Sequence, residues 1–111
     1  MEERQALSAF GALSQETRLR IIRILVIAGT DGLAAGAVAE EAGVSATNVS
    51  FHLKALEQAG LVSQQRASRS IIYTASFDAL GELVRFLMED CCAGHPKICA
   101  PTGAANPKGV E

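Results

Sequence analysis

Three cysteines lie close together near the end of the chain, at Cys91, Cys92 and Cys99. They are the only cysteines of the sequence, so they form a cluster rather than a set of scattered core thiols. Three thiolates without a fourth cysteine suit a soft centre that takes three ligands. Trivalent arsenic is such a centre, and so is antimony, because a lone pair occupies the fourth direction. This set of three thiolates therefore predicts that the cysteines bind As(III), alternatively Sb(III).

Two other uses of these cysteines stay open. His95 lies between them and would complete a set of three sulfurs and one nitrogen, which suits zinc or cadmium because zinc takes four ligands. The thiols could instead form a disulfide with one another, as in a redox sensor. An odd number of cysteines and a polar N-terminus favour cytoplasmic thiols over the disulfide framework of a secreted protein.

A second candidate site is a run of short polar residues after Val44. A helix that reads DNA needs such groups at its N-terminal end, where they reach base edges, with apolar residues behind them. The residues expected to contact bases are Ser45, Thr47, Asn48 and Ser50. His52 and Lys54 lie further along and are expected to contact the phosphate backbone. Arg69 could enter a minor groove or meet a phosphate.

Each of these residues also has a structural interpretation. Ser45 would cap a helix with or without DNA. His52 could pack against a neighbouring helix, and Arg69 could be a solvated charge in a turn. Phe51, beside His52, is expected to pack rather than to insert between bases.

The charge distribution favours the same region. The 111 residues carry a net charge of −2, which by itself argues against nucleic acid. Residues 45–75, however, hold Lys54, Arg66 and Arg69 against Glu57 alone, and they form the only basic stretch. We therefore expect double-stranded DNA to be contacted there.

Mainly helical elements are expected to position these residues. Helices are predicted at 3–13, 15–28, 35–42 and 46–60. Ser14 and Ser45 are expected to cap the second and the fourth of them. The fourth helix should bury Val49, Leu53 and Leu56, which recur at helical spacing. The tight connection at 43–45 between the third and fourth helices is typical of a helix-turn-helix.

A hairpin and a last helix follow. Strands are predicted at 61–66 and 70–75, joined by a short polar hinge, which makes the domain a winged helix. Ser76 should cap a helix from Phe77 to about Asp90. That helix carries more apolar residues than one small domain can cover, so a second copy of the chain is expected. Because neighbouring residues of an α-helix point about 100° apart, Cys91 and Cys92 can reach one atom only where the helix ends or unwinds.

Several blocks of the sequence resemble the ArsR/SmtB family of bacterial metal-responsive repressors. The resemblance covers roughly residues 5 to 92, and its blocks are 13–25, Ser50-Phe51-His52-Leu53-Lys54-Ala55-Leu56, Ala59-Gly60-Leu61-Val62 and 66–73. The vicinal cysteines with a nearby third cysteine are similar to the arsenite-sensing branch, whose site lies at the end of the last helix. The family often has Glu-Gly at the hairpin tip, where this chain has Ala67-Ser68. Loss of that glycine disfavours a tight turn, so a more open wing is expected.

The resemblance implies a mainly α fold with a small β-hairpin, a winged helix-turn-helix that dimerises through its first and last helices. It implies a transcriptional repressor that binds operator DNA as a homodimer and leaves it when metalloid binds. Residues 1–92 would form the DNA-binding and dimerisation domain, and residues 93–111 a mostly flexible tail that holds Cys99. No arrangement of nucleophile, base and orienting group is recognisable, so neither an enzyme nor a catalytic cofactor is expected. No apolar run approaches the roughly 18 residues of a membrane span.

Overall fold

Residues 1–91 are the part of the chain that the computed structural model describes, with side chains up to Met88. The helices are α1 (Glu3–Leu13), α2 (Glu16–Ala28), α3 (Ala35–Ala42), α4 (Ala46–Gln58) and α5 (Phe77–Arg85). A 3₁₀ turn, η1 (Gly29–Asp31), follows α2, and a π-helical segment, η2 (Phe86–Cys91), continues α5. The strands are β1 (Leu33–Ala34), β2 (Val62–Ala67) and β3 (Ser70–Ala75), which form an antiparallel sheet in the order β1-β3-β2. The predicted winged helix-turn-helix, mainly α with a small hairpin, is confirmed.

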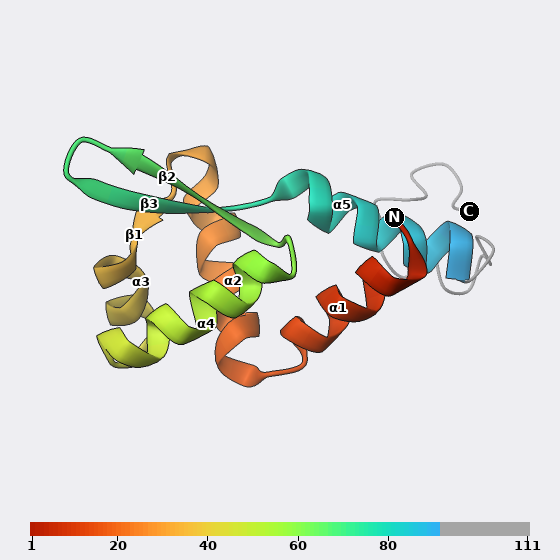
Figure 1. The fold of residues 1–111 in the computed structure, drawn as a ribbon, viewed down its shortest axis with the longest axis horizontal. Helices are drawn as coiled ribbons and strands as arrows, with labels where there is room; N and C mark the ends of the chain where they lie inside the picture. Colours follow the sequence, from red (N-terminus) through yellow and green to blue (C-terminus); the bar gives the residue numbers. More distant parts are fainter. Residues whose placement is uncertain (92–111) are drawn as a thin grey trace, which may run out of the picture.

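The elements are spread between two ends of the molecule (Figure 1). The β2–β3 hairpin projects at one end, next to α3. Helices α1 and α5 occupy the opposite end, and α2 and α4 lie between the two ends. None of the helices within residues 1–91 is long and apolar enough to cross a membrane.

The core is built where α2, α3, α4 and the base of the hairpin meet. Its fully buried larger side chains are Ile21, Leu25, Val38, Val49, Leu53, Leu56 and Leu61. The three that α4 contributes are the three that helical spacing predicted for its buried face. The opposite face of α4 is therefore left for solvent or a partner.

The connection between α3 and α4 is fixed by backbone geometry. Gly43 adopts a left-handed conformation, with φ 73° and ψ 34°. The N–H groups of Val44 and Gly43 donate to the carbonyls of Ala39 and Glu40, 3.1 and 3.3 Å away, in a Schellman pattern. Nη1 of Arg20, on α2, donates to the carbonyl of Ala42, 2.9 Å away. Helix α2 is thereby tied to the turn that aims α4.

The wing turns more tightly than the sequence predicts. Ala67 pairs with Ser70, so only Ser68 and Arg69 lie between the strands. Ser68 adopts a φ of 59°, which glycine would adopt at lower energy. The expectation of a more open wing was therefore wrong. A two-residue turn needs a residue with positive φ, and Ser68 adopts that conformation in place of a glycine.

One helix cap differs from the one that the sequence predicts. Ser14 was expected to cap α2, but Gln15 does so, with its side-chain oxygen accepting from the N–H of Arg18 at 2.9 Å. The hydroxyl of Ser14 instead donates to the carbonyl of Gly11, 2.8 Å away, at the end of α1. The caps predicted at Ser45 and Ser76 are confirmed, since their side chains accept from the N–H groups of Asn48 and Ala79.

The last helix begins at Phe77 as predicted, but it changes its winding. From Phe86 to Cys91 the α-helix gives way to a π-helix, which is rare and is frequently found at functional sites. Residues 92–111, which include the proposed tail and Cys92 and Cys99, lie outside the described residues.

Candidate nucleic-acid interface

The predicted reading face of α4 is open to solvent. Ser45, Thr47, Asn48, Ser50 and Lys54 are all exposed, and His52 is half-buried. The Ser45 hydroxyl accepts from the N–H of Asn48 at 3.1 Å, so it serves as the helix cap. The contacts of these residues with DNA stay predictions. All six side chains can be reached from solvent, although one side of His52 is covered by the protein.

No acidic residue occurs from Ser45 to Leu56. The first one, Glu57, accepts at 2.9 and 3.0 Å from the side-chain amide of Gln64 on β2. The same contact joins the wing to the C-terminal end of α4. A polyanion that contacts this stretch of α4 would therefore meet short polar groups, Lys54 and the positive end of a helix dipole.

The half-buried side of His52 faces α2. Nε of Arg18 donates to Nδ1 of His52 at 3.2 Å. That nitrogen must be unprotonated to accept, so the ring's hydrogen is on Nε2. Burial, and then the charge of Arg18, lower the pKa of His52. The histidine is therefore neutral at pH 7, packed against a neighbouring helix as its structural interpretation held, and its phosphate contact stays a prediction.

Phe51 does not pack into the protein. Its side chain is 64% exposed, so the expectation that it packs was wrong. Its ring meets His52 edge-on, with centroids 5.4 Å apart, and the Arg18 guanidinium lies over it, 5.8 Å from the centroid. Sequence reasoning missed Arg18, since nothing in its own neighbourhood marks a residue whose partner is 34 positions away.

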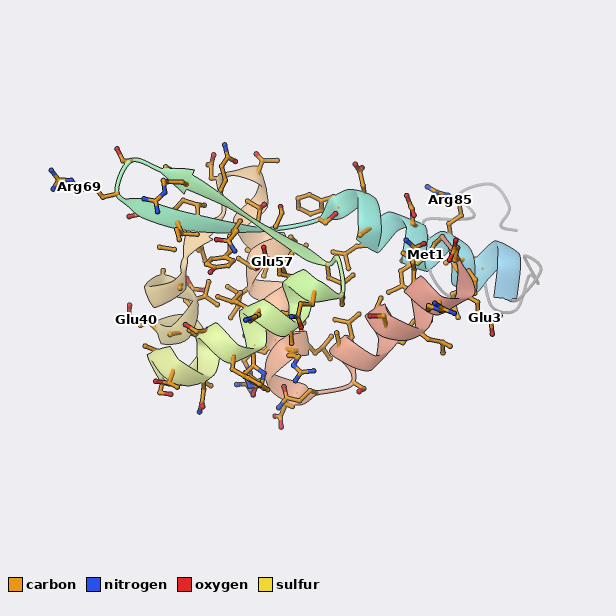
Figure 2. All side chains as sticks on the ribbon, viewed as in Figure 1. Met1, Glu3, Glu40, Glu57, Arg69 and Arg85 are labelled. Atoms are coloured by element: carbon orange, nitrogen blue, oxygen red, sulfur yellow. The ribbon has the colours of Figure 1, made fainter. Side chains whose placement is uncertain are left out.

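Arg69 lies at the tip of the wing and points away from the body of the molecule (Figure 2). Arg66, on β2, is exposed as well. It lies on the same face of the hairpin as Gln64, because residues two apart on a strand share a face. Gln64 faces α4, so Arg66 is on the side of the sheet that faces the reading helix.

The predicted cysteine site is not brought together within the described residues. Cys91 is the last residue of η2, while Cys92 and Cys99 lie outside them. Among the residues whose side chains are described, no group of three or more His, Cys, Asp or Glu could hold a metal ion.

Comparison with known proteins agrees with this arrangement. A family model described as a helix-turn-helix domain matches residues 13–65. The HTH-type transcriptional regulator YceK of Bacillus subtilis (strain 168) is 43% identical over 61 residues, and the match spans 60% of its length. The transcriptional repressor SdpR of the same organism is 31% identical over 81 residues, which cover 73% of this chain and 87% of SdpR.

Solved structures extend the likeness to the whole fold. An ArsR-like transcriptional regulator from Rhodococcus sp. RHA1 has 30% sequence identity and a TM-score of 0.71, covering 93% of this chain and 94% of its own. The chain belongs to the ArsR-like family of helix-turn-helix transcriptional regulators. The homodimeric winged helix-turn-helix DNA-binding domain Mb0332 from Mycobacterium bovis also resembles this ArsR-like chain, with 27% identity, a TM-score of 0.62 and coverage of 82% and 81%. As an ArsR-like regulator, the chain has a DNA-binding fold in which α4 is the exposed second helix of the helix-turn-helix.

Proposed function

We propose that this ArsR-like regulator is a cytoplasmic, homodimeric repressor that binds operator DNA through α4 and the wing and leaves it when trivalent arsenic, or antimony, binds to three cysteines. The observation that carries the DNA-binding part is the exposed, acid-free face of α4 with its capped N-terminus. Ser45, Thr47, Asn48 and Ser50 would contact bases there. Lys54, His52 and the wing's Arg69 would contact phosphates.

The dimer is proposed to form through α1 and the last helix. Leu7 of α1 is 64% exposed, and Val84 and Leu87 of the last helix are 51% and 41% exposed. Large apolar side chains exposed on one end of a small domain favour burial against a partner. That end is opposite the wing, so two copies joined there would leave both reading helices free (Figure 1). The related Mb0332 domain is homodimeric, which supports a homodimer of this chain as well.

The inducer is assigned by the chemistry of its donors. Three thiolates and no fourth cysteine suit the trigonal sulfur coordination of As(III). Cys91 ends η2, so it continues the helix that carries Val84 and Leu87. A ligand that pulls Cys91, Cys92 and Cys99 together would reorder that end of the dimer face.

Such a change at the dimer interface would alter the spacing between the two α4 helices of the dimer. Two reading helices fit two half-sites only at one spacing, so a small rotation of the protomers weakens binding. Metalloid and DNA affinities must then oppose each other by the same factor, because coupling between two binding sites is reciprocal.

Two other inducers remain candidates for the same fold. Zinc or cadmium would add His95 as a fourth ligand. Oxidation of the vicinal thiols would need no metal.

One titration separates these candidates. The reduced protein is bound to fluorescent DNA from its own promoter, and anisotropy is followed as arsenite, zinc or peroxide is added in parallel. Release by arsenite alone, lost in Cys91→Ser and in Cys92→Ser but kept in a Ser8→Ala control on α1, is expected. Release of a cysteine variant by arsenite would refute the three-cysteine site. Release by zinc or peroxide alone would assign the site to one of the other inducers.

A further inference from the structure

Phe51 lies in the middle of the exposed face of α4. Thr47 is four residues before it and Lys54 three residues after it, so the three share one stripe of the helix. This stripe is opposite the one that buries Val49 and Leu53. An aromatic residue that is 64% exposed is therefore presented where a partner of α4 would be.

The ring is held in place by two neighbours. The Arg18 guanidinium lies over it at 5.8 Å from the centroid, and His52 meets it edge-on at 5.4 Å. Arg18 is itself fixed by the bond from its Nε to Nδ1 of His52, 3.2 Å long. A ring held this way loses less conformational freedom when it binds a partner, which favours affinity and selectivity.

The chemistry around the ring favours DNA as that partner over another protein surface. The residues from Ser45 to Leu56 include no carboxylate, the Arg18 guanidinium lies over the Phe51 ring, and Lys54 follows on the same stripe of α4. The exposed apolar group that a base presents in the major groove is the 5-methyl group of thymine, which side chains such as phenylalanine contact.

We propose that Phe51 is a specificity-determining residue that contacts thymine methyl groups in the major groove, and that Arg18 is the residue that positions its ring. This inference rests on the proposed binding of DNA through α4. Phe51 would thus give the protein a preference for thymine, and Arg18 would affect DNA binding only by orienting the ring of Phe51.

The test removes methyl groups and nothing else. Duplexes that bind the intact protein are first selected from a random library, and the tightest is made again with deoxyuridine in place of each thymine in turn. Uracil keeps every donor and acceptor of thymine but lacks the methyl group. Burying one such group corresponds to about a fourfold gain in affinity. The intact protein is therefore expected to bind about fourfold more weakly when a contacted thymine is replaced.

Two variants assign the effect to residues. Phe51→Ala is expected to bind the thymine and uracil duplexes equally, and Arg18→Met to bring their ratio close to one. Ile27→Ala is the control, because Ile27 is 84% exposed but lies on α2 outside α4. It should keep the ratio of the intact protein.

The outcomes separate this inference from the function it rests on. If a duplex is selected but the intact protein does not distinguish thymine from uracil, or Phe51→Ala distinguishes them as well as the intact protein, the role of Phe51 is overturned while DNA binding stands. An unchanged ratio in Arg18→Met overturns the positioning role. Failure to select any duplex would overturn the proposed function, and this inference with it.

Discussion

Two glycines, Gly29 at the start of η1 and Gly32 directly after it, allow a steric effect on the wing to be separated from backbone strain. Gly29 has φ 74° and ψ −154°, and Gly32 has φ 67° and ψ −170°. Both conformations belong to a region that essentially only glycine occupies. Alanine should therefore be strained equally at the two positions. What differs is the space around the added methyl group.

At Gly32 there is no space. A Cβ atom built there lies 2.5 Å from the carbonyl oxygen of Tyr73 and 2.6 and 2.7 Å from the Cγ2 atoms of Thr74 and Ile72, all on β3. At Gly29 such an atom meets nothing within 4 Å in the described part of the chain. The carbonyl belongs to the backbone of the wing, so relief requires that β3 moves.

The magnitudes follow from this comparison. The strained conformation costs about 1–3 kcal/mol for alanine. Alanine also lowers the conformational entropy of the unfolded chain, which stabilises the folded state by about 0.4–1 kcal/mol. Gly29→Ala should thus lose about 1–2 kcal/mol of unfolding free energy. Gly32→Ala should lose a further amount of about 1–3 kcal/mol, typical of an overpacked site.

Thermal unfolding followed by circular dichroism measures the difference. For a domain of this size, about 4–8 °C of melting temperature corresponds to 1 kcal/mol. Gly32→Ala should therefore melt below Gly29→Ala by at least about 4 °C, at matched protein concentration because a dimer's stability depends on it. Equal melting temperatures would refute the packing of Gly32 against β3.

Three further predictions concern α4. Ser45→Ala should lower the free energy of unfolding by about 1 kcal/mol in urea denaturation, because the capping bond to Asn48 is lost; no change would contradict the cap. Leu53→Ala should cost about 2–5 kcal/mol in the same assay, because Leu53 is fully buried; a cost like that of a surface residue would show that α4 is not anchored there. Since the folded pKa of His52 lies below its usual 6.5, the unfolded chain binds a proton first as pH falls. Stability should be fully present above pH 6.5 and decrease below it, and His52→Gln should remove that part of the slope in unfolding measured against pH; an unchanged slope would assign the dependence to other groups.

Local patterns in the sequence were sufficient for most of the fold. The buried spacing of Val49, Leu53 and Leu56, the cap at Ser45 and the turn at Gly43 each depend on neighbouring residues, and the structure agrees with all of them. The strand β1 was missed because it has only two residues and exists through its pairing with β3, some 40 positions away.

The site was predicted less completely for the same physical reason. The exposure of the polar face follows from helical spacing and could be predicted. The contact of Arg18 with His52 and Phe51 depends on how α2 packs against α4, which no local pattern contains. Phe51 was expected to pack because phenylalanine is apolar, but it stays 64% exposed, with the Arg18 guanidinium over its ring and the imidazole of His52 edge-on to it.

The serine at the tip of the wing also bears on the order of folding. Hairpins that fold early are nucleated by a turn whose residues favour positive φ, and Ser68 does not favour it. The β2–β3 pairing must therefore be stabilised by Val62 and Ala75, which are buried at the base of the wing and need α2 and α4 in place. We therefore expect the wing to form late and to open early, with amide hydrogens at its tip that exchange sooner than those near Val62 and Ala75.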